Sequence, residues 1–261
     1  MLFNYKYLLD YCTLKTAEDA CVLDYGCGKG EMVSVGRSNN IDIYGVDIFY
    51  KDGGSRNEVE KRGLLGTYVK EINGGKIEFP DQHFDLVVSN QVFEHVDNLD
   101  MVLNEISRVL KPKGSLHCLF PVKETWWEGH FGVLFLHLFE PGSKWRYSYA
   151  KLWRSLGLGY HHASRSKHDW SKYVCEWVDK YTVYRSLDDV VSLFEKYFIN
   201  VSFTEDDYLY YRIQNSNIPF KKLLQYCHKM TLGKYILRCI YRKRGGIVIT
   251  ATKRCPELEE V

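Results

Sequence analysis

The sequence predicts an α/β protein with a seven-stranded, mostly parallel sheet and flanking helices, and three observations support this fold class. From Cys21 onward, short apolar segments rich in β-branched residues alternate with longer helical segments, as in parallel strands joined by crossover helices. A glycine-rich turn follows the first apolar segment, and an acidic residue ends the second. A chain of 261 residues is long enough for one domain with insertions, so we assign residues 1–261 to a single domain.

Seven segments are predicted to form the strands of this sheet. Phe84–Ser89 has the nearly continuous apolar character of a central parallel strand, and Asp85 near its start is expected to hydrogen-bond within the fold. In chain order the predicted strands are Cys21–Tyr25, Ile41–Val46, Gly66–Ile72, Phe84–Ser89, Ser115–Phe120, Phe198–Phe203 and Gly246–Thr252.

Three helices are predicted beside these strands. Leu99–Leu110 carries apolar residues at helical spacing, and the Lys-Pro-Lys-Gly sequence of residues 111–114 ends it. Glycines open the helix predicted over Gly30–Ser38. A third helix is predicted over Leu187–Tyr197, directly after Ser186, a residue type that favours the N-cap position.

Two segments interrupt the alternation. Residues 122–186 follow the fifth strand, are rich in Trp, Tyr, His and Arg, and contain helical stretches but no clear strand. We interpret them as an aromatic helical insertion or lid. Residues 207–245 precede the last strand and form a basic insertion, in which Pro219–Arg244 is predicted to be helical with an interruption at Gly233.

The charge of the chain is distributed unevenly. Residues 208–256 contain eleven Lys or Arg and no Asp or Glu, which leaves 24 basic and 33 acidic residues, a net charge of −9, in the rest of the chain. Such a segment faces an anionic polymer, an anionic membrane surface, or the acidic remainder of its own fold. We favour the last interpretation and keep peripheral contact with an anionic inner membrane face open.

The apolar segments and the cysteines indicate a cytoplasmic protein. Asn4, Lys6 and Asp10 break the first residues before a signal-peptide core forms. The longest apolar stretch, Phe131–Phe139, is far shorter than the roughly 20 residues of a membrane span. The eight cysteines show no Cys-x-x-Cys pair or zinc-ligand spacing, so we expect reduced, mostly buried thiols.

The glycine-rich turn has a spacing that favours one class of ligand. Residues 22–30 read Val-Leu-Asp-Tyr-Gly-Cys-Gly-Lys-Gly, with glycines at Gly26, Gly28 and Gly30. Glycines at the start of a helix let the backbone approach a ligand closely. A dinucleotide fingerprint reads Gly-x-Gly-x-x-Gly, so the third glycine here comes one residue too early for a nicotinamide-dependent oxidoreductase, the competing enzyme class.

The acid at the end of the second strand is the second functional signal. Asp47 lies 17 residues beyond Gly30. A carboxylate at this position can accept hydrogen bonds from both hydroxyls of an adenosine ribose. Its charge also disfavours a 2′-phosphate on that ribose.

Two further motifs complete a set of four. Residues 79–96 read Phe-Pro-Asp-Gln-His-Phe-Asp-Leu-Val-Val-Ser-Asn-Gln-Val-Phe-Glu-His-Val, and residues 110–116 read Leu-Lys-Pro-Lys-Gly-Ser-Leu. In this order and spacing, the four motifs resemble the class I S-adenosylmethionine-dependent methyltransferases with a Val-Leu-Asp-x-Gly-Cys-Gly-x-Gly loop. The resemblance covers roughly residues 21–121 and implies a Rossmann-like fold, with S-adenosylmethionine as the cofactor.

The resemblance also implies roles for residues at matching positions. Asp24 and the three glycines of the loop would line the methionine part of the cofactor, and Asp47 would hold the ribose. The loop after the third strand would meet the adenine edge, where extra residues leave Glu71 and Asn73 as alternatives. The implied cofactor-binding residues are Asp24, Gly26, Gly28, Gly30, Asp47, Ile48, Glu71, Ile72 and Asn90.

His95 is the candidate catalytic residue, because methyl transfer to a hydroxyl requires deprotonation and a nearby His can act as the general base. A packing or capping role remains the alternative. Glu94-His95 also resembles part of the Glu-x-x-Glu-His element of metal-dependent relatives. Gln91 stands where that element has its first acid, so we expect no metal.

The insertion is expected to select the acceptor, because added segments shape the pocket of such enzymes. Trp126, Trp127 and His130 directly follow the fifth strand and are the candidate substrate-binding residues; a core role for the aromatics is the alternative. The segment is similar to methyltransferases of bacterial surface-polysaccharide assembly. We therefore expect O-methylation of a sugar, glycan or small-molecule hydroxyl by in-line transfer.

Two other functions remain open. A catalytically degenerate methyltransferase-like module would use the aromatic insertion to bind a partner. An RNA methyltransferase would use the basic segment, but residues 89–92 read Ser-Asn-Gln-Val rather than the Asn-Pro-Pro-Tyr pattern of enzymes that methylate base amines. Nucleic acid is therefore the less favoured partner.

Overall fold

A central sheet of seven strands organises the computed structural model, which describes residues 2–17, 19–50, 54–161 and 165–254. The strand order is β3-β2-β1-β4-β5-β9-β8. Strands β3, β2, β1, β4 and β5 run parallel, whereas β9 is antiparallel to both of its neighbours. This confirms the predicted fold class. The strands are β1 (Cys21–Tyr25), β2 (Asp42–Asp47), β3 (Val69–Glu71), β4 (Phe84–Asn90), β5 (Leu110–Phe120), β8 (Phe198–Phe203) and β9 (Ile247–Lys253).

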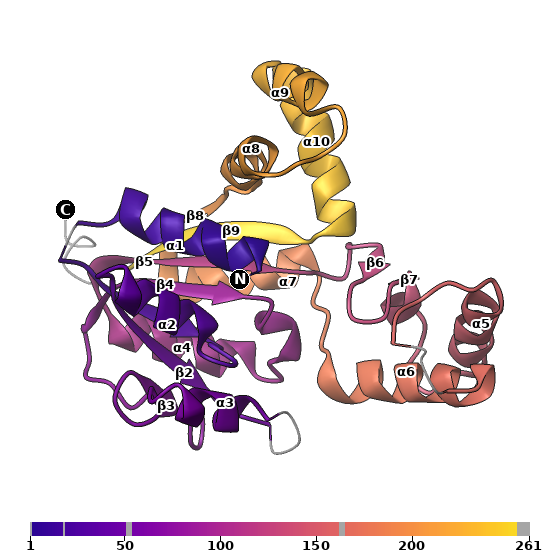
Figure 1. The fold of residues 1–261 in the computed structure, drawn as a ribbon, viewed down its shortest axis with the longest axis horizontal. Coiled ribbons are helices and arrows are strands. Elements are labelled where there is room, and N and C mark those ends of the chain that lie inside the picture. The colour runs from indigo at the N-terminus through magenta and orange to yellow at the C-terminus, as the bar shows by residue number, and fades with distance from the viewer. Residues whose placement is uncertain (1, 18, 51–53, 162–164, 255–261) are drawn as a thin grey trace.

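Helices cover both faces of the sheet (Figure 1). Because side chains alternate along a strand, Leu23 packs with α4 and α7 in one core, while Val22 packs with α1, α2, α3 and α8 in the other. The helices are α1 (Phe3–Lys15), α2 (Glu31–Ser38), α3 (Ser55–Lys61), α4 (Leu99–Val109), α5 (Lys144–Ser155), α6 (Lys167–Tyr181), α7 (Leu187–Tyr197), α8 (Glu205–Asn215), α9 (Lys221–Lys229) and α10 (Thr231–Arg244).

Several local predictions are confirmed. The Ser186 hydroxyl accepts a hydrogen bond from the Asp189 amide and so caps α7. The Asp85 carboxylate accepts hydrogen bonds from the Cys21 amide at 2.9 Å and from the Lys111 ammonium at 2.7 Å. Seven cysteines among the described residues are free thiols, five of them buried, and Cys255 lies outside the described residues.

Residues 122–186 form a lobe at one side of the sheet (Figure 1). The lobe has its own core, in which Trp170 is fully buried against Phe131, Val174 and Val178. Its two ends meet, since the Lys123 amide donates to the Arg185 carbonyl at 2.8 Å. The expectation that it holds no strand is wrong, because β6 (Trp127–Glu128) and β7 (Val133–Leu134) form a short antiparallel pair.

The position of the helix break in the basic segment was also predicted wrongly. The break lies at Met230, between α9 and α10, and Gly233 lies inside α10. A Cβ atom on Gly233 would lie 2.0 Å from the Cys227 carbonyl oxygen. The glycine therefore permits close packing of α10 against the end of α9 rather than ending a helix.

The start of β5 differs from the prediction as well. The strand begins at Leu110 rather than at Ser115, because Leu110 pairs with Phe84 before the register shifts and Ser115 pairs with Leu86. The extra residues form a bulge. Helix α1, which no motif indicated, packs Leu8 and Leu9 into the second core.

Candidate active site

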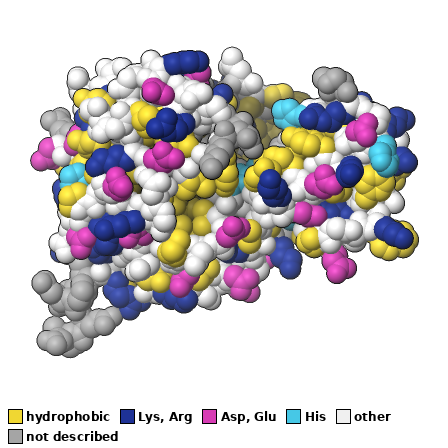
Figure 2. Space-filling model, turned by 90° about the horizontal axis from the view of Figure 1, so that it is seen from below, with side chains coloured by type: hydrophobic (Ala, Val, Ile, Leu, Met, Phe, Trp, Pro, Cys, Tyr) yellow, Lys and Arg dark blue, Asp and Glu magenta, His cyan; other side chains and the backbone are white. Residues whose placement is uncertain are grey.

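A cavity of about 540 Å³ opens at the carboxyl ends of β1, β2 and β4. Strand order reverses between β1 and β4, and ligands of open α/β sheets bind at such a switch point. Figure 2 shows hydrophobic side chains gathered in the hollow between the sheet domain and the insertion lobe. The residues lining the cavity include Tyr25, Gly26, Gly28, Asp47, Ile48, Tyr50, Ile72, Gly75, Gln91, Val92, His95 and Met101.

The glycine turn and Asp47 form one hydrogen-bonded unit at the cavity wall. The amides of Gly26 and Cys27 donate to the Val46 carbonyl at 2.8 and 3.1 Å. The Gly28 amide donates to one carboxylate oxygen of Asp47 at 2.8 Å, and the Phe49 amide donates to the other at 2.8 Å. Asp47 therefore has a fixed orientation, and each carboxylate oxygen keeps acceptor capacity for a ligand.

Gly26, Gly28 and Gly30 all have positive φ angles, of 78°, 53° and 67°, in the region that favours glycine. Gly26 has a second constraint, because a Cβ atom there would lie 2.3 Å from a methyl group of Val92. A Cβ atom on Gly28 would meet nothing within 4 Å. The turn thus packs closely at Gly26 and is open at Gly28.

Asp24 lies behind the turn rather than on the cavity wall. Its side chain is buried, and its Oδ2 atom has no hydrogen-bond partner among the described residues. Burial, with the nearby Asp47 carboxylate, raises the pKa of Asp24 to about 7. A buried carboxyl with an unused oxygen and a perturbed pKa is typical of a functional position.

The other predicted cofactor residues divide between the cavity and its surroundings. Ile48 and Ile72 line the cavity. Glu71 instead pairs with the Arg56 guanidinium at 3.2 Å. The Asn90 amide oxygen accepts a hydrogen bond from Asn4 of α1 at 2.9 Å, and neither Glu71 nor Asn90 is among the lining residues.

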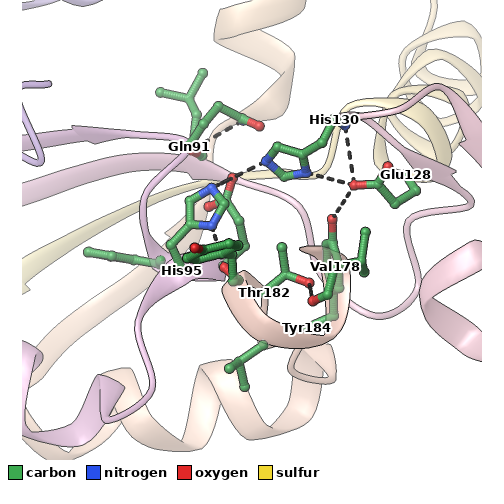
Figure 3. A network of polar contacts seen from close by, with 12 residues as sticks. Gln91, His95, Glu128, His130, Val178, Thr182 and Tyr184 are labelled. Atoms are coloured by element: carbon green, nitrogen blue, oxygen red, sulfur yellow. Dashed lines mark hydrogen bonds and ion pairs between the residues drawn. The ribbon is translucent and has the colours of Figure 1, made fainter. Parts of the chain in front are cut away.

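His95 reaches the cavity from a 3₁₀ helix over Phe93–His95 and meets His130 from the insertion (Figure 3). The two Nε2 atoms are 3.2 Å apart. Nδ1 of His95 lies 2.6 Å from the Tyr181 carbonyl oxygen, and Nδ1 of His130 lies 2.6 Å from the Glu128 carboxylate. The structure therefore brings two predicted site residues together although 35 positions separate them in the sequence.

The electrostatic surroundings of the two histidines differ. Burial lowers the pKa of His95. Burial also acts to lower the pKa of His130, but the Glu128 carboxylate outweighs it, and the pKa of His130 is raised. Beside them, burial raises the pKa of Glu94 to about 8.

Trp126 and Trp127 line a second hollow of about 480 Å³, together with Lys243 and Arg244 of α10. Neither tryptophan lines the first cavity. The Lys243 ammonium lies 5.2 Å from the centre of the Trp126 ring, and the Arg244 guanidinium lies 4.9 Å from that of Trp127. The aromatic insertion and the basic segment thus share one surface.

Sequence reasoning missed several residues of the site. Tyr25 and Val92 stand inside the recognised motifs and line the cavity, so their positions beside motif residues were an available signal. Glu128 and Tyr184, which hydrogen-bond to each other at 3.2 Å around His130, come from an insertion without a known motif. Only the folded structure brings them to His95.

Comparison with known proteins identifies the central part of this fold. Residues 23–118 match the family model described as a methyltransferase domain. A sterol 24-C-methyltransferase of Yarrowia lipolytica is 36% identical over 97 residues, which cover 36% of this chain and 25% of that protein. A ubiquinone/menaquinone biosynthesis C-methyltransferase of Shewanella is 32% identical over 103 residues, covering 36% of this chain and 40% of that protein. The chain therefore aligns with less than half of the length of these relatives.

Solved structures agree at the level of the fold. An S-adenosylmethionine-dependent methyltransferase from Mesorhizobium loti superposes with a TM-score of 0.52 at 12% identity, covering 96% of this chain and 98% of that one. A geranyl diphosphate C-methyltransferase from Streptomyces coelicolor superposes with a TM-score of 0.50 at 14% identity, covering 96% and 78%. The sheet and its flanking helices have the Rossmann-like methyltransferase fold.

Two of the three glycines of the turn, Gly26 and Gly28, provide a matched pair of variants. Gly26→Ala combines left-handed strain with overpacking against Val92, and each effect costs about 1–3 kcal/mol. Gly28→Ala has the strain alone. We expect the free energy of unfolding, measured by urea denaturation, to fall about twice as far for Gly26→Ala as for Gly28→Ala. Equal losses would show that the contact with Val92 does not constrain the turn.

Proposed function

We propose that this protein is a class I S-adenosylmethionine-dependent methyltransferase that transfers the methyl group in line to a hydroxyl of a sugar, glycan or small molecule. The observation that carries the proposal is the glycine turn hydrogen-bonded to Asp47 at the sheet's switch point. The match of residues 23–118 to a methyltransferase domain supports the same assignment.

The cavity suits the parts of this cofactor. Asp47 has acceptor capacity for the ribose hydroxyls, and Ile48 and Ile72 offer apolar side chains to the adenine ring. The open backbone at Gly28 admits the cofactor closely. We assign the buried carboxyl of Asp24, behind the turn, to the ammonium of the methionine part, because a cation there would stabilise the ionised form that burial disfavours.

His95 is the group we assign to the acceptor. Because the Tyr181 carbonyl accepts a hydrogen bond from Nδ1, Nε2 of neutral His95 carries a lone pair. The lowered pKa keeps His95 neutral at physiological pH, as a general base requires. Nε2 is then the atom that takes the proton of the acceptor hydroxyl while the oxygen attacks the methyl carbon.

The second hollow supports a glycan acceptor. Sugar rings have apolar faces and polar edges, and Trp126 and Trp127 present aromatic surface beside two cations. This pairing suits an anionic sugar or a phosphorylated glycan. We propose that the hollow binds a distal part of such an acceptor, as in bacterial polysaccharide assembly, while His130 lies near the reacting end.

Cofactor binding provides the first test. We expect S-adenosylmethionine to bind with micromolar affinity in calorimetry, and Asp47→Ala to abolish detectable binding because the ribose loses its acceptor. Asp42→Ala is the matched control and should bind normally, because Asp42 lies at the half-buried start of the same strand and pairs with Arg37 away from the cavity lining. Circular dichroism checks that both variants fold.

Either alternative outcome of this titration is informative. Binding of NADH instead of S-adenosylmethionine would contradict the methyltransferase assignment. Binding of neither compound would favour the degenerate binding module.

Acceptor class is tested with labelled S-adenosylmethionine and a panel of sugars, lipid-linked glycans, RNA, sterols and quinones. We expect label to enter a sugar hydroxyl, and His95→Asn to slow transfer by about 100-fold or more through loss of the base. His168→Ala, on the exposed surface of the insertion, should retain full activity. Labelling of RNA, or of a sterol or quinone carbon, without any sugar product would refute glycan O-methylation.

The α9–α10 hairpin supports peripheral contact with an anionic membrane. Part of the basic segment is neutralised within the fold, because Arg242 pairs with buried Glu205 at 2.8 Å. Helix α10 nevertheless has no buried residue. Lys222, Lys229 and Arg244 are exposed around the hairpin, whose exposed apolar side chains are Leu223, Tyr226, Met230, Leu232, Tyr235, Ile236 and Ile240.

We propose that this face rests on an anionic bilayer, because apolar contact and basic charge together stabilise interfacial helices. No helix within the described parts of the chain is long and apolar enough to cross a membrane, so the proposed contact is peripheral. A lipid-linked glycan would then be presented at the same surface as the second hollow.

Vesicle cosedimentation tests the membrane contact. We expect the protein to bind vesicles containing phosphatidylserine but not vesicles of phosphatidylcholine alone. The double variant Leu232→Asp, Ile236→Asp should bind at least about tenfold more weakly, because two apolar side chains are lost from the interface. Leu156→Asp, at a leucine of the insertion that is as exposed as Leu232, serves as the control. Unchanged binding of the double variant would exclude the hairpin as the contact.

A further inference from the structure

Three potential metal ligands converge where the insertion meets the sheet domain. One carboxylate oxygen of Glu94 and one ring nitrogen each of His95 and His130 all lie within 4.8 Å of one another. Glu94 and His95 come from the 3₁₀ helix after β4, and His130 comes from the loop between β6 and β7. From the sequence, Glu94 and His95 resembled only part of a metal-binding element. No metal was expected, because Gln91 replaces an acid and His130 is distant in the chain.

The hydrogen bonds around the two histidines fix their tautomers. The Tyr181 carbonyl and the Glu128 carboxylate only accept hydrogen bonds, so each Nδ1 atom must carry its proton. In the neutral rings both Nε2 atoms then have lone pairs, and these face each other at 3.2 Å (Figure 3). Such an arrangement requires a positive charge between or beside the two nitrogens.

The environment of Glu94 favours a metal ion over a proton as the positive charge near the two Nε2 atoms. The residue is 1% exposed, and neither carboxylate oxygen has a hydrogen-bond partner among the described residues. A proton shared by the two histidines would leave both of these oxygens unsatisfied, at a substantial cost in a buried position. A cation held by all three side chains would provide a partner for one Glu94 oxygen and for both Nε2 atoms.

The distances also suit a metal ion. Two nitrogens that each lie about 2.0–2.1 Å from a tetrahedral ion are about 3.3 Å apart, close to the observed 3.2 Å. The nearest oxygen of Glu94 is 3.9 Å from Nε2 of His95, so a small movement of its side chain completes the set. Two imidazoles and one carboxylate form a ligand set used by catalytic zinc and by other divalent transition metals.

The surroundings have the form of an outer coordination shell. Metal-binding histidines usually donate their second N–H group to a carboxylate or a carbonyl, and here His130 donates to Glu128 and His95 to Tyr181. Glu128 is fixed in turn by the Phe131 amide at 2.9 Å and the Tyr184 hydroxyl at 3.2 Å. Each ligand ring is therefore held with its Nε2 atom toward the centre.

We propose that Glu94, His95 and His130 bind one divalent transition-metal ion at the acceptor end of the cavity. Three protein ligands leave a coordination position for an oxygen from outside the protein, and His95 lines the cavity. Resting on the proposed function, the ion would bind the acceptor hydroxyl and lower its pKa, which releases the proton to solvent as the oxygen attacks the methyl group. This would revise the base role assigned to His95 above: its Nε2 lone pair would be directed to the ion, and the loss of activity expected for His95→Asn would arise from the loss of a ligand.

Metal titration tests this site independently of activity. Chelator-treated protein is titrated with Zn²⁺ by calorimetry and with Co²⁺ by visible absorption. We expect one site per chain, with a Co²⁺ spectrum of low coordination number. Glu94→Gln and His130→Ala should abolish both signals, and Glu128→Gln should weaken Zn²⁺ binding by about 10–100-fold. His168→Ala controls for general histidine binding.

Each result has a defined meaning. Absence of a stoichiometric site for Zn²⁺ or Co²⁺ in the wild type, or binding that persists in Glu94→Gln and His130→Ala, overturns the proposal. Near-ultraviolet circular dichroism separates lost ligands from lost folding, and Glu94→Gln, which preserves side-chain size, is the variant least affected by that problem. Titration of the chelated protein with S-adenosylmethionine tests the proposed function separately.

Discussion

The hydrogen bonds between the end of β2 and the glycine turn after β1 determine the geometry on which the rest of the site depends. The turn cannot move away from β2 while Val46 accepts two of its amides and Asp47 accepts a third. The carboxylate that we assign to the ribose therefore also helps to shape the loop beside it. Asp47 thus contributes both to the position of the turn and to the chemistry of the site.

Buried carboxyl groups around this unit differ in how well they are satisfied. Glu128 accepts hydrogen bonds from two amides, an imidazole and a hydroxyl, as expected for a structural buried charge. Asp24 and Glu94 are similarly buried, but Oδ2 of Asp24 and both carboxylate oxygens of Glu94 have no hydrogen-bond partner within the described parts of the chain. Unpaired buried carboxylate oxygens are costly, and the ammonium and the metal ion proposed above would each provide a partner for one of these groups.

Features that depend on local interactions were predicted correctly from the sequence. β1, α7 and β8 were predicted with their observed bounds, because strand composition and the Ser186 cap are local signals. The glycine turn and Asp47 were predicted because each lies within a short continuous motif.

Residues brought together from distant parts of the chain were not predictable in this way. The pairing of His95 with His130 depends on how the insertion folds, and the contact of Asn4 with Asn90 joins positions 86 residues apart. The role of Gly233 was predicted wrongly for the same reason. This position requires glycine because the end of α9 packs closely against it, and not because of its own backbone conformation.

The closed neck of the insertion has a consequence for how such proteins diversify. Because Lys123 and Arg185 are hydrogen-bonded to each other, the chain leaves and re-enters the sheet domain at one point, and the lobe between them has its own core. The length and sequence of such an inserted segment can change at little entropic cost to the sheet domain. Recombination at this neck would replace the proposed acceptor side of the site and leave the proposed cofactor side unaltered. The exceptions are the contacts across the boundary that Glu94 and His95 make, and those of Trp126 and Trp127 with α10.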